Sequence, residues 1–544
     1  MPSQMNRHTL FSLSSLLCLL FAVFACILEE CDGLTTNIIT HRAVAVFALM
    51  ESMKRNQKFA IRVLEQDPAY LNLDQRDRAF ARNLLSTTER RMGQIDQVIK
   101  SFAHKKEDKK KNTKIRPHDI LCEAALRIGA TQILFLDVPT YAAVSETVEA
   151  LKNHPKVKVS KAQISYVNAV LRNIDREGKS RLDATSTLAN VDTWLADQWI
   201  QTYGKEKTEK MVGAAMSQSP VFITVNHNHQ DNSETKQQDT ILDRSESIRD
   251  VFTSIAGEEE DDDDDDDFEQ VEAEAELLPI GSIRIPANVG GSVSKWPLYD
   301  DGAWWVQDVS ATLPAIALFN SLCINGGKQP KDIHVVDLCS APGGKTAQLC
   351  SMGFGKVDAV EISKRRSRSL HQNLKRLGME NLCNVCVEDG TKFQPHLSEN
   401  DDGVQGVLVD APCSATGLGS RRPDVLRKSI NLDELISIQR ELVVHAANNI
   451  LDVGGVLVYA TCSLLKQEGE DQVDWLLSQD VPGKDENTEL LSSTLETIPF
   501  ELGEIPGFDD CIDENGWLRI IPGVLPGSLQ FCDGFFVARM RKIA

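Results

Sequence analysis

The sequence lacks the cysteine and glycine patterns that would point directly to a disulfide scaffold, a zinc site or a P-loop. Its thirteen cysteines are spread over 544 residues and suggest no disulfide framework. Cys383 and Cys386 form one CxxC pair, but no second Cys or Cys/His pair stands at similar spacing, so no metal is expected. Gly344-Lys345-Thr346 ends like a P-loop, yet Cys339 stands where that motif requires its first glycine.

Excess positive charge is also lacking, which is unusual for a protein that binds nucleic acid. The net charge is −21, but the stretch from Glu258 to Glu276 alone holds fourteen acids and no base. Without that stretch the chain carries −7, so the overall charge does not exclude an RNA partner.

Long apolar runs are scarce, and the single candidate lies near the N-terminus. Residues 10–28 are mostly apolar, Arg7 precedes them, and Val23 and Ala25 offer a signal-peptidase-like site. Residues 1–33 are therefore interpreted as a signal or targeting segment. A membrane anchor is the alternative, because nineteen mostly apolar residues nearly span a bilayer. After targeting, no stable membrane partner is expected.

Residues 40–175 are predicted to form an all-α domain. Thr40 can cap a first helix, and apolar residues then recur at helical spacing. Further helices are predicted near residues 80–99, 120–136, 141–151 and 162–174. A Lys/Arg-rich run at 105–116 is either a solvated loop or a patch that contacts phosphate.

The middle of the chain divides into a linker and an acidic insertion. Residues 176–228 are interpreted as a helical linker, with two helices in 191–216, followed by the first strand of a preparatory subdomain at 220–226. Residues 229–277 are predicted to be a disordered insertion, because ten consecutive acids at 258–267 repel one another and cannot pack.

Residues 278–544 alternate strand-like and helix-like segments, which is typical of a doubly wound α/β sheet. The first predicted strand of this sheet, at 333–338, is followed by a short loop and a helix. Later strands are predicted at 357–361, 384–388, 406–410, 455–460, 518–521 and 535–540.

The loop after that first strand predicts a nucleotide-like ligand. It is built from small residues, and the helix that follows supplies free N–H groups. Glu361, Asp389 and Asp410 fall at or just beyond strand ends, where open α/β sheets bind ligands. Each acid alone is more typical of a cap or a turn, but three acids in phase with the loop favour a binding site.

Two cysteines stand at neighbouring strand ends. Cys413 follows the strand at 406–410, and Cys462 follows the strand at 455–460. Either one alone is typical of a small buried residue, but the pair beside a ligand loop suggests nucleophilic chemistry. A thiolate can add to C6 of a pyrimidine, which makes C5 electron-rich and able to attack an electrophilic methyl group.

The motifs at 337–346, 410–417 and 460–463 strongly resemble those of the RNA cytosine-C5 methyltransferases of the bacterial small-subunit (16S) rRNA type. The segments 305–310 and 533–536 match that family as well. The helical region resembles its NusB-type RNA-binding domain, through the segments 76–81, 134–139 and 166–172. Together the resemblance covers about 42–175 and 278–544.

The resemblance implies a Rossmann-like S-adenosylmethionine-dependent methyltransferase domain preceded by an all-α NusB-like domain. It implies that Cys462 is the nucleophile, that Cys413 assists breakdown of the covalent adduct, and that Asp410 contacts the base. The implied partner is small-subunit rRNA before full ribosome assembly. The residues implied to hold S-adenosylmethionine are Cys339, Ser340, Ala341, Pro342, Gly343, Gly344, Lys345, Glu361, Asp389 and Asp410.

Two alternatives in function remain open at this stage. The same chemistry on tRNA is one, and a non-catalytic RNA-binding ribosome-assembly factor is the other. A bacterial-type rRNA enzyme with a signal peptide fits an organelle reached through the secretory route, such as a plastid. A mitochondrial, cytoplasmic or membrane-anchored location is the alternative.

Overall fold

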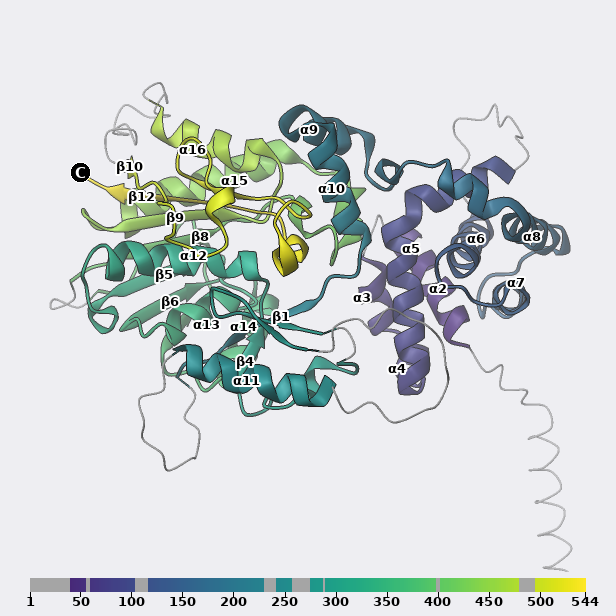
Figure 1. Ribbon diagram of the computed structural model, residues 1–544, viewed down its shortest axis with the longest axis horizontal. Helices are drawn as coiled ribbons and strands as arrows, with labels where there is room; N and C mark the ends of the chain where they lie inside the picture. Colours follow the sequence, from purple (N-terminus) through teal and green to yellow (C-terminus); the bar gives the residue numbers. More distant parts are fainter. Residues whose placement is uncertain are drawn as a thin grey trace, which may run out of the picture.

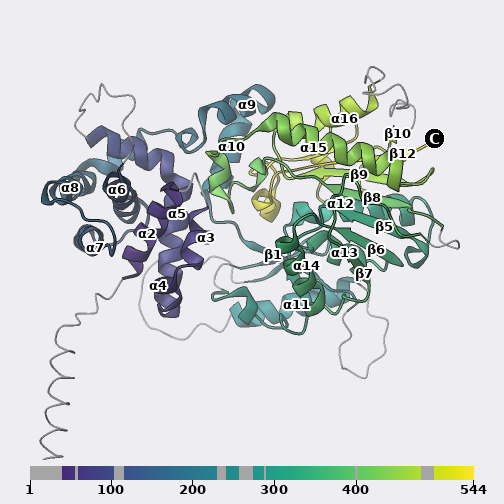
Figure 2. The same cartoon turned by 180° about the vertical axis from the view of Figure 1, so that it is seen from behind.

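The computed structural model describes residues 40–54, 59–102, 116–228, 241–256, 274–286, 289–397, 402–478 and 495–544. The targeting segment at 1–33, nearly all of the basic run at 105–116 and the acids at 258–267 lie outside these residues. Figures 1 and 2 show a helical domain at one end of the molecule and an α/β domain at the other. No helix in the described ranges is long and apolar enough to cross a membrane.

The helical domain forms around one long central helix, α6 (Figure 1). The cap that the sequence predicts is confirmed, since the Ala43 N–H donates to Thr40 Oγ1 at 3.3 Å. Two short helices, α3 and α4, were not expected from the sequence. The helices are α2 His41–Lys54, α3 Ala60–Glu65, α4 Pro68–Leu71, α5 Gln75–Phe102, α6 Pro117–Phe135, α7 Thr140–Lys152 and α8 Lys161–Asp183.

A glycine sets the close packing of α6 against α8. A Cβ added at Gly129 would lie 2.7 Å from Leu171 Cδ1, which is closer than side chains tolerate. The two helices therefore approach through the missing side chain, and Leu171 is completely buried there.

Two linker helices, α9 Thr193–Tyr203 and α10 Lys205–Met216, pack against the α/β domain. Trp199, which is buried, shares one apolar cluster with Leu426 and Leu464 of that domain. The expectation of two helices over residues 191–216 is confirmed.

A small antiparallel sheet in the order β2-β3-β1-β4 stands before the large one. Its strands are β1 Val221–Val225, β2 Glu276–Leu277, β3 Ile283–Ile285 and β4 Trp304–Val306. The strand expected at 220–226 is confirmed as β1.

The expectation that residues 229–277 form a disordered insertion is wrong for part of that segment. Residues 241–256 form helix α11 Ile241–Ala256, and β2 lies within the same stretch. Ile248 and Phe252, one helical turn apart, are buried, and the Phe252 ring centroid lies 5.7 Å from both Trp296 and Trp304. A short apolar stripe is enough for a helix here because the aromatic face of the small sheet covers it.

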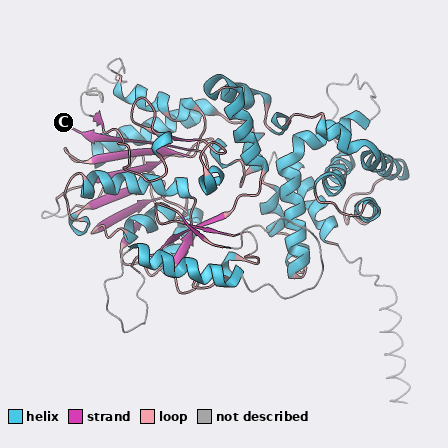
Figure 3. Cartoon of the chain, in the orientation of Figure 1, coloured by secondary structure: helices cyan, strands magenta, loops and turns pink. Residues whose placement is uncertain are grey.

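The large sheet has eight strands in the order β10-β12-β9-β8-β5-β6-β7, with β11 paired to β12 (Figure 3). Strands β9, β8, β5, β6 and β7 are parallel, β12 pairs antiparallel with β9, and β10 and β11 pair antiparallel with β12. The predicted α/β class is confirmed. The strands are β5 His334–Leu338, β6 Lys356–Val360, β7 Cys383–Cys386, β8 Gly406–Asp410, β9 Val456–Thr461, β10 Leu495–Thr497, β11 Leu518–Ile520 and β12 Phe535–Lys542.

Helices cover both faces of the large sheet. Successive residues point to opposite faces, so Val335 packs with α12 and α13 while Val336 packs with α15. Both are fully buried, which explains the continuous apolar strands. The helices are α12 Val309–Phe319, α13 Gly344–Ser351, α14 Lys364–Arg376, α15 Leu432–His445 and α16 Glu470–Leu477.

The helical domain docks on the segment that follows the Cys413 loop. The Arg427 guanidinium donates to the Asn190 carbonyl at 3.0 Å and to the Glu89 carbonyl. Arg90 donates in return to the Ser420 carbonyl at 3.2 Å. The two domains are therefore joined directly beside one of the predicted active-site loops.

Candidate active site

The loop after β5 is held mainly through its backbone. Cys339 and Gly343 adopt φ values of +65° and +106°, in the left-handed region. The Ser340 N–H and hydroxyl both donate to the Val360 carbonyl at the end of β6, at 3.0 and 3.1 Å. Helix α14 holds the other side, where Arg366 donates to the Ala341 carbonyl at 2.5 Å and Asn373 to the Pro342 carbonyl at 2.8 Å.

The structure explains the glycine at position 343 differently from the expectation that a ligand lies against the small residues of this loop. A Cβ at this position would lie 2.6 Å from Leu370 Cδ1, so the space beside it belongs to α14 and not to a ligand. The positive φ also favours glycine. Gly344 is less restricted, because its Cβ would meet only Gln307, at 3.6 Å.

Glu361 is the acid that best fits a ligand hydroxyl. Its side chain is 1% exposed, and Oε1 accepts the Ser363 N–H at 2.8 Å. Oε2 has no hydrogen-bond partner among the described residues, although an Arg366 guanidinium nitrogen lies 3.5 Å away. A buried carboxylate oxygen without a donor is costly, so a donor from a bound molecule would satisfy it.

The other two acids already have partners in the protein. Asp389 accepts the Thr391 N–H at 3.0 Å and the Thr391 hydroxyl at 2.8 Å, and this hydrogen bonding lowers the pKa of Asp389. Asp410 lies 2.7 Å from the Lys345 ammonium and joins the end of β8 to the loop after β5.

Lys345 is a buried cation at the centre of the site. Burial alone would lower the pKa of Lys345, but the Asp410 carboxylate outweighs that effect and the pKa is raised. The Cys462 sulfur acts in the same direction, which places the ammonium within electrostatic reach of this thiol. Nζ also lies 5.1 Å from the centre of the Phe535 ring.

Asp337 lies behind the loop and was not expected to be a site residue. It is completely buried, and the Thr346 hydroxyl donates to its Oδ2 at 2.5 Å. Burial raises the pKa of Asp337 to about 7. Its other oxygen, Oδ1, has no hydrogen-bond partner in the part of the chain that the structure describes.

The structure brings the two predicted cysteines together. Their Sγ atoms lie 3.4 Å apart, between the loop after β8 and the loop after β9. The hydrogen bond with Cys462, together with burial, raises the pKa of the Cys413 thiol well above its usual range. Cys462 lies within electrostatic reach of Lys345 and Arg422.

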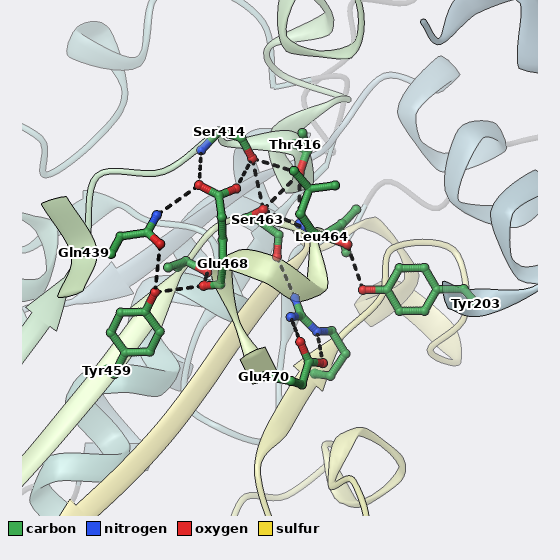
Figure 4. Close-up of polar contacts among 12 residues, drawn as sticks. Tyr203, Ser414, Thr416, Gln439, Tyr459, Ser463, Leu464, Glu468 and Glu470 are labelled. Carbon is green, nitrogen blue, oxygen red and sulfur yellow. Dashed lines mark hydrogen bonds and ion pairs between the residues drawn. The ribbon is translucent and has the colours of Figure 1, made fainter. Parts of the chain in front are cut away.

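A buried polar network behind the cysteines was missed by the sequence analysis (Figure 4). Glu468 and Gln439 are completely buried and bind residues of both cysteine loops. They lie in segments far along the chain from Cys413, and neither stands at a strand end. The only sequence signal that could have indicated Glu468 is its separation along the chain from Cys462.

A second buried cluster joins Asp308, Arg421 and Asp533. The Arg421 guanidinium pairs with both carboxylates, at 3.2 Å in the case of Asp533. Burial raises the pKa of Asp533 and Arg421 opposes that rise. Asp308 and Asp533 belong to segments that carry the family resemblance, but no local pattern indicates that they meet.

No group of three or more metal-ligating side chains occurs in the described part of the chain. The pKa of Cys383 in the CxxC pair is raised, most strongly by a hydrogen bond with Cys350.

Comparisons with known proteins agree with this architecture. Residues 328–541 match the family model of the 16S rRNA methyltransferase RsmB/F, and residues 40–176 match the NusB family. A curated ribosomal RNA small subunit methyltransferase B from Sodalis glossinidius is 27% identical over 511 residues, covering 92% of this chain and 97% of the relative. A small subunit methyltransferase F from Cronobacter sakazakii is 36% identical over 247 residues, covering 45% of each chain.

A solved structure, that of PH0851, has the same fold, with a TM-score of 0.62 and 20% identity over 92% of this chain and 99% of the other. The predicted resemblance is thus confirmed for both parts of the molecule. Residues 328–541 belong to the 16S rRNA methyltransferase RsmB/F family and are preceded, at residues 40–176, by a domain of the NusB family.

Proposed function

We propose that this protein transfers a methyl group from S-adenosylmethionine to C5 of a cytosine in small-subunit rRNA, through a covalent bond between Cys462 and C6. The observation that carries this proposal is the pair of sulfurs 3.4 Å apart at the ends of β8 and β9, beside the loop after β5. The relatives named as small-subunit rRNA methyltransferases support the reaction class and the substrate.

The residues at the edge of β5 and β6 fit the methyl donor. Glu361 Oε2, buried and without a hydrogen-bond partner within the described ranges, suits a ribose hydroxyl, and the loop 339–345 offers a close backbone approach. Asp389 and Asp410 would complete the binding site. When bound, S-adenosylmethionine supplies an electrophilic methyl group.

The chain's own residues carry the remaining chemistry. The Cys462 thiolate adds to C6, and the electron pair displaced to C5 forms the new bond to the methyl carbon as the bond from that carbon to the donor's sulfonium breaks and a neutral thioether leaves. C5 then loses its proton while the bond from Sγ to C6 breaks, which returns Cys462 as a thiolate. Cys413 assists this elimination, and Lys345 stabilises negative charge on Cys462.

The target base must leave its stack to reach sulfurs held between two loops. The helical domain joins the α/β domain beside the Cys413 loop, where Arg427 donates to the Asn190 carbonyl, so RNA held by the helical domain would lie near the sulfurs. The NusB-family domain supports an RNA substrate in the same way.

A methyl-transfer assay tests the proposal. The full chain is incubated with labelled S-adenosylmethionine and with protein-free small-subunit rRNA, assembled small subunits or tRNA, and 5-methylcytosine is then mapped. We expect label on protein-free rRNA. Label on tRNA alone would show that the substrate is tRNA and not small-subunit rRNA. RNA binding without methyl transfer would favour a non-catalytic ribosome-assembly factor.

We also propose that residues 1–33 direct the protein to an organelle, with a plastid as the best fit for a bacterial-type enzyme behind a signal peptide. A fluorescent protein fused behind residues 1–41 tests this location in a plastid-bearing cell. Fluorescence confined to mitochondria, cytoplasm or a surface membrane would contradict it.

A further inference from the structure

One buried carboxylate connects both cysteine loops. Glu468 is completely buried, and its Oε1 accepts the Ser414 N–H and the Gln439 side-chain amide, each at 2.9 Å. Its Oε2 accepts the Ser414 hydroxyl (Figure 4). Three donors therefore converge on this side chain, one of them from the backbone that follows Cys413.

The same network reaches the neighbours of each cysteine. Gln439 also donates to the Pro412 carbonyl, before Cys413, at 3.0 Å. The Glu468 carbonyl accepts the Thr461 hydroxyl, before Cys462, at 3.2 Å. Ser414 Oγ and Ser463 Oγ, which follow the two cysteines, lie 3.0 Å apart. Each cysteine is therefore flanked on both sides by residues of one network.

A carboxylate here is costly unless it has a role. Glu468 forms no ion pair within the described residues, since the nearby Arg519 guanidinium is engaged by Glu470 at 2.6 Å. Buried charges without a counter-ion cost several kcal/mol, on the order of the cost of a lost core side chain. A neutral amide could accept hydrogen bonds from the same donors without burying a charge, so the charge itself needs an explanation.

The charges around the two sulfurs differ. Cys462 is within reach of the cations Lys345 and Arg422. Cys413 is within reach of the Glu468 carboxylate, which adds to the hydrogen bond and burial that raise the pKa of this thiol. Among the described residues, the other charged or titratable groups around Glu468 and the pair include Asp410, Tyr459, Arg440 and the Arg519–Glu470 ion pair.

We propose that Glu468 is a positioning residue that holds Cys413 and Cys462 in contact and keeps their shared proton on Cys413, so that Cys462 is the sulfur free to attack. This inference rests on the proposed function and deepens it. It assigns the difference between two otherwise similar thiols to a carboxylate that touches neither the base nor the methyl donor.

Two substitutions in the full-length protein separate the geometric part from the electrostatic part. Glu468→Gln keeps the shape, because its oxygen can accept from Ser414 and Gln439 and its amide can donate to the Ser414 hydroxyl. Glu468→Ala removes the side-chain hydrogen bonds to Ser414 and Gln439. Tyr459→Phe is the matched control, because it deletes the two hydrogen bonds of this hydroxyl, to the Glu468 backbone carbonyl at 2.8 Å and to Gln439 Oε1 at 3.3 Å, and leaves the carboxylate untouched.

The first readout is the pH dependence of alkylation of Cys413 and Cys462, resolved by peptide mass spectrometry. The second is the rate at which rRNA becomes bound to the protein in a form that survives denaturation. Calorimetric affinity for S-adenosylmethionine reports whether the fold is intact.

With Glu468→Gln we expect Cys413 to be alkylated at lower pH than in the wild type, with unchanged affinity for S-adenosylmethionine. With Glu468→Ala we expect adduct formation to slow about 100-fold, the scale expected when reacting groups are misplaced by about 1 Å. Tyr459→Phe should leave the alkylation profile of Cys413 in place.

A wild-type alkylation profile in Glu468→Gln would overturn the electrostatic role, and a wild-type adduct rate in Glu468→Ala would overturn the positioning role. If the wild-type protein transfers no methyl group to any RNA, the proposed function fails instead. The alkylation profiles still test Glu468 in that case, so the two failures are distinguishable.

Discussion

The loop after β5 and the two cysteine loops lie at the same edge of one sheet, yet they are held in different ways. The first is shaped by its own backbone, with left-handed residues at Cys339 and Gly343 and carbonyls bound by α14. The cysteine loops are held by buried side chains, above all Glu468 and Gln439. The backbone conformation of the binding loop is thus set by its own residues, with α14 binding two of its carbonyls, whereas the reactive pair depends on buried side chains that arrive from elsewhere.

The largest effects are expected at the cysteines. Cys462→Ala should form no covalent adduct and transfer no methyl group, whereas Cys413→Ala should attack and methylate and then stall. The measurement is a protein–RNA band that survives denaturation, present with Cys413→Ala and absent with Cys462→Ala. The opposite pattern of bands would mean that the two cysteines exchange roles.

The backbone-held loop should be most sensitive to strain. Gly343→Val places a branched side chain at a φ of +106° and against Leu370, so the loop must move and affinity for S-adenosylmethionine should fall at least about tenfold, a loss of about 1.4 kcal/mol. Calorimetry measures this affinity. Gly353→Val is the matched control, because Gly353 also has a positive φ but its Cβ would meet nothing within 4 Å. Equal losses in both variants would show that strain anywhere nearby is enough.

The carboxyl group behind the loop should make stability depend on pH. The folded-state pKa of Asp337 is raised to about 7 from 3.8, so its contribution is fully present below pH 4 and is lost as pH rises through 7. Asp337→Asn should therefore become more stable relative to wild type by a few kcal/mol between pH 4 and 8, at about 1.4 kcal/mol per unit of pKa. Denaturant unfolding of both proteins across this range checks it, with the exposed Asp332→Asn as control. A constant difference across the range would contradict the shift.

The interface between the helical and α/β domains, beside the Cys413 loop, should contribute less to the free energy of unfolding. Arg427→Ala leaves the Asn190 and Glu89 carbonyls without this donor and should lower the free energy of unfolding by about 1–3 kcal/mol. The exposed neighbour Lys428→Ala should change it by less than about 0.5 kcal/mol. If the two variants unfold alike, the domains are joined mainly by other contacts.

The smallest effect is expected from the acidic tract. Residues 257–273 connect α11 to β2, and replacing them with a short Gly/Ser bridge should leave methyl transfer and both loops unchanged. Helix α11 must be retained, because Phe252 packs on the small sheet. Lost activity with retained affinity for S-adenosylmethionine would show that the tract takes part, for example by mimicking RNA.

Much of the fold and of the site could be predicted because its signals are local. The strand, loop and helix around 334–351 and the strand β8 follow from contiguous apolar runs and from small residues at the turn. The positions of Cys413 and Cys462 after neighbouring strands follow in the same way, since the ends of parallel strands meet at one edge.

Local signals were insufficient where a distant partner decides the outcome. The acidic composition around α11 did not indicate that two apolar residues of this helix are buried, because composition does not show which sheet face is free to cover them. At Gly343, small size suggested space for a ligand, and only the packing of α14 shows that Leu370 fills that space.

The sequence by itself determined the two domains, the order of the parallel strands along the chain and the residue types at their ends. These depend on hydrophobic periodicity and turn chemistry within a few residues. Only the tertiary structure decided that the sulfurs lie 3.4 Å apart, that Glu468 lies behind them, and that the NusB-family domain docks through Arg427. Those contacts join residues tens to hundreds of positions apart, and they form only when the whole chain packs around its cores.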